Sequence, residues 1–242
     1  MRLRRDRAAC VASCLVRHHQ HECWTGVSAA QPGSRVAVYA EPMVEPASDF
    51  VVLLVGGASG AGKTMLGRPL ARRLGVNLTE VDDIQIALEA ATTERDLPLL
   101  HFWRTNFEEY STWSDDRRVA HHVQVCREVF QPVMRAIIAD HLATGIRVVY
   151  EGDFLLPEMA SFATYGDEPN AGRVRALFVS EPDDTQIADN YRAREGEVKP
   201  ERARTSALFD AFLRAECARY DVPVVHARPW SSVVERAVAA LR

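Results

Sequence analysis

Residues 57–64 carry the clearest chemical signal in the chain. The segment reads Gly57-Ala58-Ser59-Gly60-Ala61-Gly62-Lys63-Thr64. Its fixed positions are occupied by glycines, a lysine and a threonine. The glycines let successive backbone N–H groups turn inward around an anion, because no β-carbon obstructs the turn. Lys63 supplies a flexible positive charge, and the Thr64 hydroxyl is suited to bind Mg²⁺. The spacing G-x-x-x-x-G-K-[ST] is that of the P-loop and predicts a nucleotide phosphate site.

The chain's choice of basic residues supports this interpretation. Among its 29 basic residues only two are lysines, Lys63 and Lys199, and arginine fills all the other basic positions. A lysine at this point in the motif therefore favours a phosphate site over the alternative, a glycine-rich turn that binds nothing.

Acidic residues at two later positions are expected to face the same phosphates. They are Asp82 with Asp83, and Glu151 with Asp153. Phosphoryl transfer needs Mg²⁺ to neutralise oxygens and an acidic group to orient or deprotonate the acceptor hydroxyl. We expect Asp82 or Asp83 in the second role, with Glu151 or Asp153 assisting the metal through water. The alternative for the aspartate pair is a cap on the following helix, since aspartate is favoured there.

Arginines form a second group of candidates. Four lie between residues 192 and 204, namely Arg192, Arg194, Arg202 and Arg204. Around a flexible segment they would form a lid that closes over the transferred phosphoryl group. The alternating glutamates favour the alternative, a solvated charged face. Arg104, in an aromatic stretch at residues 101–113, could receive a carboxylate or phosphate of the substrate; core packing is the alternative for the aromatic residues.

The elements that must position these residues alternate along the chain. Strands are expected at residues 50–55, 76–81, 146–150, 174–179 and 222–226. Helices are expected between them, and residues 92–117 are expected to be irregular. One long helix from about Ser114 to Ala143 would bury Val119, Val123, Cys126, Phe130, Val133 and Ile137. The pattern predicts an α/β fold in three layers, with a parallel sheet of about five strands, helices on both faces and a small arginine-rich lid.

Over residues 50–242 the chain resembles small-molecule P-loop kinases of the adenylate and shikimate kinase type. The likeness lies in G-G-A-S-G-A-G-K-T, then L-A-R-R-L-G-V, then the acidic pair. Within that group, Glu151-Gly152-x-x-Leu155-x-Pro157 is similar to the E-G-x-x-L-x-P segment of 2-phosphoglycerate kinases. The resemblance implies that Lys63 and Thr64 bind ATP and Mg²⁺, and that Arg192 and Arg194 act in a lid.

One departure from that family concerns the acceptor. Where 2-phosphoglycerate kinases have V-H after E-G, this chain has Asp153-Phe154. A further carboxylate in the acceptor pocket argues against a doubly anionic substrate. The expected activity is therefore an ATP-dependent small-molecule kinase, and the acceptor is left open. The alternatives are a regulatory ATPase or switch without an acceptor, and a toxin-like nucleotide-sugar kinase.

Composition limits the remaining possibilities. The net charge of −4 gives no sign of a broad nucleic-acid surface, and no apolar run is long enough for a membrane span. Five cysteines at irregular spacing favour reduced thiols and a cytoplasmic protein. Residues 1–48 are expected to be a disordered extension, with Met43 as a possible start, and residues 49–242 to form the kinase domain. The oligomeric state is left open.

Overall fold

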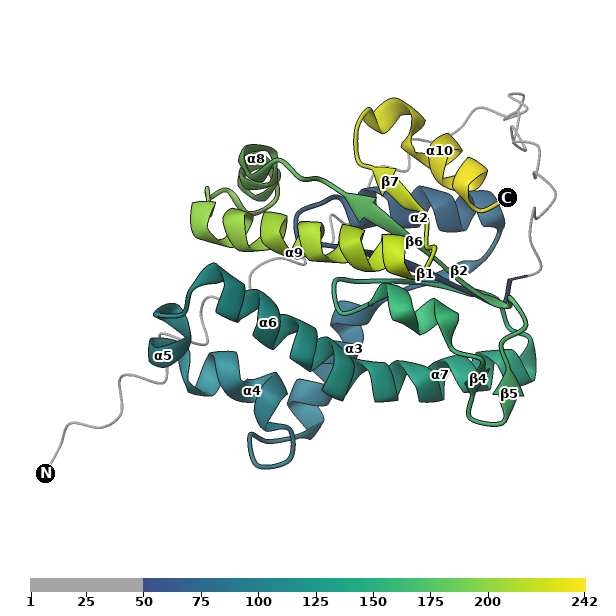
Figure 1. Cartoon of the computed structure of the whole chain (residues 1–242), viewed down its shortest axis with the longest axis horizontal. Coiled ribbons are helices and arrows are strands. Elements are labelled where there is room, and N and C mark those ends of the chain that lie inside the picture. The colour runs from purple at the N-terminus through teal and green to yellow at the C-terminus, as the bar shows by residue number, and fades with distance from the viewer. Residues whose placement is uncertain (1–49) are drawn as a thin grey trace, which may run out of the picture. The chain divides into compact units, whose positions relative to one another are not determined.

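Five parallel strands form the sheet that carries the P-loop (Figure 1). The computed structural model describes residues 50–242, so the expectations for residues 1–48 and for Met43 lie outside the described residues. The strands are β1 (Val52–Gly57), β2 (Asn77–Glu80), β3 (Val148–Glu151), β6 (Val174–Ser180) and β7 (Val224–His226). Their order is β2-β3-β1-β6-β7, and every neighbouring pair is parallel. The predicted parallel sheet is confirmed, with β1 at its centre.

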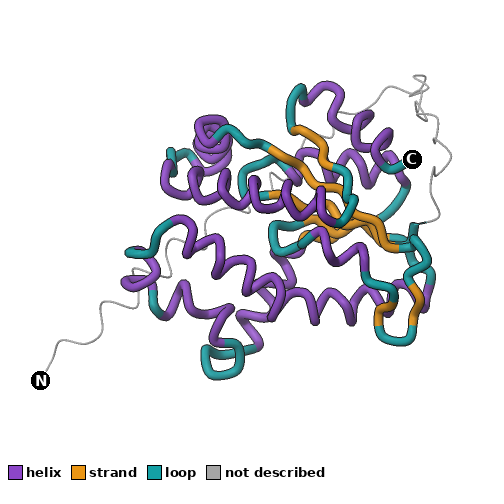
Figure 2. Tube along the Cα trace, in the orientation of Figure 1, coloured by secondary structure: helices purple, strands orange, loops and turns teal. Residues whose placement is uncertain are grey.

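Helices cover both faces of this sheet (Figure 2). On one face lie α2 (Lys63–Leu74) and α10 (Val233–Ala240). The other face is covered by α6 (Asp115–Val125), a π-helical turn (Cys126–Phe130), α7 (Gln131–Thr144) and α9 (Pro200–Arg219). The remaining helices are α3 (Val81–Ala91), α4 (Pro98–Thr105), α5 (Phe107–Ser111) and α8 (Asp184–Glu195). No helix among residues 50–242 combines the length and apolar composition needed to cross a membrane.

Short elements complete the connections. They are two 3-10 turns, Pro157–Ser161 and Trp230–Ser232, and a hairpin of β4 (Thr164–Tyr165) with β5 (Glu168–Pro169). The hairpin packs beside α7, at the opposite end of that helix from the π-helical turn (Figure 2).

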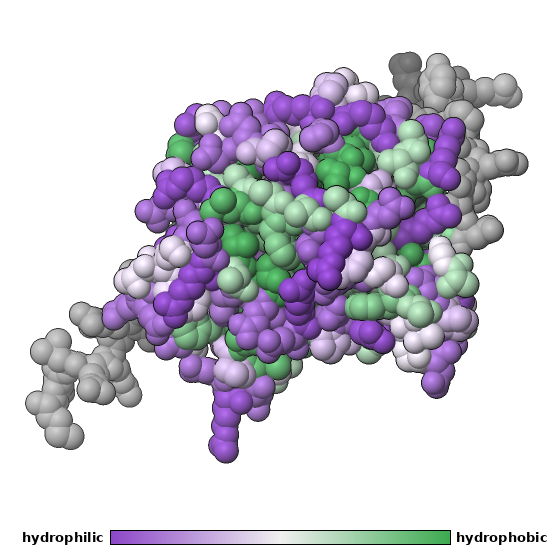
Figure 3. Space-filling view, in the orientation of Figure 1, coloured by the Kyte–Doolittle hydropathy of each residue, from purple (hydrophilic) through white to green (hydrophobic). Residues whose placement is uncertain are grey.

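Alternate residues of β1 enter two separate cores. Val52 and Leu54 face α7 and α9, whereas Leu53 and Val55 face α2 and α10, and all four are fully buried. This is the pattern expected of a central parallel strand with helices on both sides. Hydrophilic residues cover most of the face shown in Figure 3, and hydrophobic residues gather near its centre. Because β1 is buried on both faces, its position is fixed, and so is the start of the P-loop that follows it.

A glycine ends the helix that follows the P-loop. Leu66 and Leu70 of α2 are fully buried, and the helix ends at Gly75, whose φ of 65° is left-handed. Glycine adopts this conformation without the penalty that a β-carbon would impose, so it is a natural helix stop.

The long helix contains a π-helical turn that the sequence pattern does not reveal. Up to Phe130 the predicted face is correct for Val123, Cys126 and Phe130, which are buried, whereas Val119 is only partly buried. Beyond it the buried residues are Met134, Ile138 and Leu142, each one position later than a continued α-helical pattern requires. The wider turn adds a residue and rotates the following helix. Val133 and Ile137 are therefore only partly buried, which corrects the prediction.

Two other segments differ from expectation. Residues 92–117 are largely helical, because α4 and α5 lie there, so the prediction of irregular structure was wrong. Pro98 is compatible with this, since proline fits the first turn of a helix. The arginines expected in a lid lie near the end of α8 and the start of α9, joined by residues 196–199. A separate arginine-rich lid stays a prediction.

Gly56 provides a test of how tightly β1 packs against β6. A β-carbon at this position would lie 2.1 Å from the ring of Phe178. We expect Gly56→Ala to lower the free energy of unfolding by about 1–3 kcal/mol in a denaturant titration, because the core is overpacked. In a Phe178→Ala background the same change should cost much less, since the two sites are in contact. An equal cost in both backgrounds would contradict this packing.

Candidate functional site

The P-loop folds back over the start of α2. Gly57, Gly60 and Gly62 have φ values of 147°, 79° and 91°, which side chains with a β-carbon rarely adopt. A β-carbon at Gly57 would also lie 2.5 Å from the carbonyl oxygen of Val179. The side chain of Lys63 is buried beneath the loop, and its Nζ donates to the carbonyl oxygen of Ala58 at 3.2 Å. The first N–H groups of α2 have no intrahelical partner and are free for an anion.

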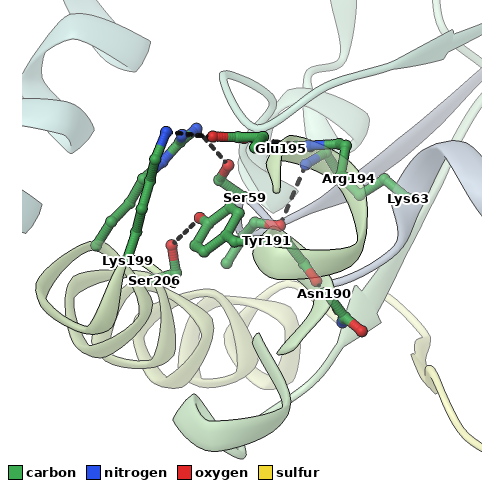
Figure 4. Close-up of polar contacts among 11 residues, drawn as sticks. Ser59, Lys63, Asn190, Tyr191, Arg194, Glu195, Lys199 and Ser206 are labelled. Atoms are coloured by element: carbon green, nitrogen blue, oxygen red, sulfur yellow. Dashed lines mark hydrogen bonds and ion pairs between the residues drawn. The ribbon is translucent and has the colours of Figure 1, made fainter. Parts of the chain in front are cut away.

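Helices α8 and α9 hold the loop from outside. Asn190 of α8 donates through Nδ2 to the carbonyl oxygen of Gly60 at 2.8 Å. Arg202 of α9 donates through Nη2 to Oγ of Ser59 at 3.1 Å. Between the two helices the buried Tyr191 shares a hydrogen bond of 2.9 Å with Ser206 (Figure 4). The Asn190 contact cannot be inferred from the sequence, because these two segments lie far apart in the chain.

Two pockets meet at the P-loop. The one we call the carboxylate pocket has a volume of about 410 Å³, and its polar side includes Lys63, Thr64, Asp82, Glu151, Asp153 and Arg202. The other, which we call the tryptophan pocket, measures about 610 Å³ and is lined by Gly60, Gly62, Met65, Arg68, Asn190 and Trp230, among others. Both pockets share the same four residues, Lys63, Thr64, Asp82 and Arg194.

Three carboxyl groups surround Lys63 in the carboxylate pocket. Thr64 donates through Oγ1 to Oε2 of Glu151 at 2.9 Å. Burial raises the pKa of Glu151, although Lys63 and this hydrogen bond oppose the rise. The pocket walls also desolvate Asp82, and together with the nearby charge of Asp153 they raise its pKa. Burial would raise the pKa of Asp153, but Lys63, followed by His122 and Arg202, holds it below its usual range.

The structure separates the two aspartates of the predicted pair. Asp82 lines both pockets, whereas Asp83 lines neither, although both residues are exposed to solvent. The helix-cap alternative was wrong, because Glu80 occupies the N-cap of α3 and both aspartates lie in the first turn, where their charges suit the helix dipole.

The four arginines are separated in the same way. Arg194 and Arg202 line the carboxylate pocket. Arg192 pairs instead with Asp189 at 3.1 Å, and Arg204 with Asp115 at 3.5 Å, and neither of these arginines lines the two pockets. Arg104 does line the carboxylate pocket, where it pairs with Glu89 at 2.6 Å.

Several wall residues were not chosen from the sequence. His121 and His122 line the carboxylate pocket with Gln85. The Nε2 atom of His122 donates to the carbonyl oxygen of Asp153 at 3.0 Å, because a carbonyl can only accept. Trp230 closes the tryptophan pocket, and its ring lies 2.0 Å from where a β-carbon of Gly62 would be. Neighbouring histidines and a lone tryptophan give no spacing signal that marks them as wall residues.

The residues present fit a nucleoside triphosphate with Mg²⁺. Glycines at positive φ leave room for phosphate oxygens against the backbone, and Lys63 supplies the opposite charge. No group of three or more His, Cys, Asp or Glu side chains among residues 50–242 is placed to hold a metal ion. This suits Mg²⁺, which binds through few protein ligands together with substrate phosphates and water. Thr64 and Glu151 would hold it.

The pair Asp82 and Asp153 provides a test by carboxyl NMR titration. We expect Asp82 to titrate above its ordinary range and Asp153 below it, for the reasons of burial and charge given above. Asp153→Asn removes a neighbouring negative charge and should lower the pKa of Asp82. Asp116→Asn, on the exposed start of α6, should leave it unchanged. A pKa of Asp82 that does not respond to Asp153→Asn would contradict the arrangement.

Of the comparisons with known proteins, only the one with solved structures found matches. No protein-family model matches the sequence, and no curated protein matches it. Among solved structures, a gluconokinase from Sinorhizobium meliloti is 20% identical with a TM-score of 0.41, covering 78% of this chain and 90% of that one. A sugar kinase from a Janibacter species is 18% identical with a TM-score of 0.42, covering 79% and 94%.

A shikimate kinase from Aquifex aeolicus is also similar. It is 16% identical with a TM-score of 0.42, and the alignment covers 78% of this chain and 95% of that one. Likeness at this level concerns the fold, so the reaction has to follow from the chemistry of the site. The chain thus has an α/β fold with a five-stranded parallel sheet, helices on both faces, and a P-loop at the centre of its carboxyl edge.

Proposed function

We propose that the protein is an ATP-dependent kinase that moves the γ-phosphoryl group of ATP to a hydroxyl group of a small molecule. One observation carries this proposal: two pockets that meet at the P-loop share Lys63, Thr64, Asp82 and Arg194. A donor in one pocket and an acceptor in the other would meet at these four residues. Holding two reactants in this way is a large part of what a phosphotransferase has to do.

The tryptophan pocket is the proposed donor side. Its P-loop amides and Lys63 would bind the phosphates, and the indole of Trp230 offers a face for the base. Thr64, with Glu151 acting through water, would hold Mg²⁺. When bound, the metal neutralises phosphate oxygens and makes the terminal phosphorus easier to attack.

The carboxylate pocket is the proposed acceptor side. Asp82 lies at the boundary between the pockets and is the proposed base, since it is the member of its pair that lines both. Its raised pKa favours this role, because a stronger base takes a hydroxyl proton more readily at neutral pH. Arg194 and Arg202 would stabilise charge on the transferred group.

The acceptor 2-phosphoglycerate is the finer proposal suggested by the sequence resemblance. The carboxylate of Asp153 in the acceptor pocket weighs against it, because 2-phosphoglycerate carries both a carboxylate and a phosphate. An ADP-release assay that compares 2-phosphoglycerate with uncharged hydroxylated metabolites tests directly whether the acceptor is 2-phosphoglycerate or an uncharged compound. A regulatory ATPase would instead release ADP at a rate that no acceptor changes.

The first functional prediction concerns Lys63. Lys63→Ala should lower ATP turnover by about 100-fold or more, since it removes the positive charge beneath the phosphates. Circular dichroism should show an unchanged fold. Lys199→Ala removes the other lysine of the chain, which pairs with Glu195 outside both pockets, and should keep most of the turnover. Full activity of Lys63→Ala would refute the proposed site.

The second prediction separates Asp82 from Asp83. Asp82→Asn should lower kcat by about 10²–10⁴-fold, the range for loss of a general base, whereas Asp83→Asn should change it little. A carboxyl group with a raised pKa in the folded state costs stability once the pH rises through that pKa. Asp82→Asn should therefore also raise the free energy of unfolding at pH 7. Equal losses of activity in both variants would contradict the assignment of the base to Asp82.

A further inference from the structure

The wall of the carboxylate pocket opposite the P-loop is built from rings and apolar side chains. It contains Leu100, Trp103, Tyr110, His121, His122 and Phe154. Leu100 and Phe154 are buried, and the aromatic residues between them are half-buried. Such a wall can cover the apolar face of a ring but offers few groups that would bind an anion.

Other rings hold this wall in place from behind. Phe154 is stacked on Phe130 with ring centroids 3.9 Å apart and an angle of 15° between the planes. His122 lies 5.0 Å from Phe154 and meets Phe209 edge-on at 4.6 Å. Because the rings are packed on both sides, the wall is largely formed before any ligand arrives.

The basic side chains of the pocket already have carboxylate partners. Arg104 pairs with Glu89, whose side chain is only 6% exposed, and it also stacks on the ring of Trp103 at 4.6 Å. Arg194 and Arg202 both pair with Glu195, as Figure 4 shows for Arg194. Glu89 and Glu195 do not line the pocket. Glu89 therefore offsets the charge of Arg104, whereas Glu195, which also pairs with Lys199, offsets only part of the charge of Arg194 and Arg202.

Two carboxylates of the pocket, in contrast, have no ion-pair partner in the described part of the chain. Among residues 50–242, neither Asp82 nor Asp153 forms an ion pair within 4.0 Å. Lys63, the nearest cation, is expected to serve the phosphates of the donor. Ionised carboxylates only accept hydrogen bonds, so these two require hydroxyl or ammonium donors and repel anions.

We propose that the acceptor is an uncharged or cationic ring compound that carries hydroxyl groups and no anionic group. Its hydroxyl or ammonium groups would donate to Asp82 and Asp153, and its ring would lie against Trp103, Tyr110 and Phe154. This inference rests on the proposed kinase function and names the substrate class of the same site.

A series of three glycosides that differ only in charge tests the proposal. Phenyl β-D-glucoside is uncharged, phenyl β-D-glucosaminide is cationic and phenyl β-D-glucuronide is anionic. Titration calorimetry on the full chain, with a non-hydrolysable ATP analogue and Mg²⁺ present, should show the anionic compound binding at least about tenfold more weakly than the other two. Tighter or equal binding of the glucuronide, or no binding by any of the three, would overturn the proposal.

Two variants test whether the carboxylate of Asp153 causes the charge preference. Asp153→Asn should weaken binding of the cationic glycoside by about tenfold and reduce the discrimination against the glucuronide. Asp116→Asn makes the same chemical change on the exposed start of α6 and should alter neither value. An unchanged charge preference in Asp153→Asn would count against the proposal.

An ADP-release screen of hydroxylated compounds, sorted by charge, separates this inference from the kinase function. Stimulation by uncharged or cationic ring compounds supports both. Stimulation of ADP release by anions alone would support the kinase function and overturn the proposed substrate class. Charge-dependent binding without stimulation by any compound would support the binding preference and overturn the kinase.

Discussion

The site depends on the buried positive charge of Lys63. Its ammonium group lies beneath the P-loop, bonded to the carbonyl oxygen of Ala58, and its charge opposes the rise in pKa that burial imposes on Glu151. A buried charge is costly unless opposite charges and hydrogen bonds surround it. The carboxyl groups of Glu151, Asp82 and Asp153 provide that surrounding, so the sheet edge has to bring the segments that follow β2 and β3 to one lysine.

The sheet meets this requirement because β1 lies between β3 and β6. Parallel strands bring their carboxyl ends to one edge, and the P-loop and the acidic segment after β3 are therefore neighbours. Close backbone contact brings α3 to the same place, since a β-carbon at Gly152 would lie only 2.6 Å from Cβ of Val81. Packing that permits no side chain at this point holds Asp82 and Asp153 on facing segments.

Charge pairing divides the site into two kinds of surface. Glu195 collects Arg194, Lys199 and Arg202, and these partners hold its pKa at about 2 although burial opposes them. At neutral pH the cluster is thus fully charged, and its arginines are engaged before any phosphate binds. A phosphate group would have to compete with Glu195 for these arginines. A ligand that binds Asp82 would have no ion-pair partner to displace among the described residues.

The sequence by itself determined the P-loop and the order of the five strands along the chain, because glycine spacing and apolar periodicity are local properties. It also placed Asp82 and Asp153 near the lysine through the rule that strand ends converge. Only the tertiary structure excluded Asp83, Arg192 and Arg204 from the pockets, since adjacent residues on a helix point in different directions. The contact of Asn190 with Gly60 was likewise invisible, because it joins segments that are distant in sequence, and the apolar spacing did not reveal the π-helical turn.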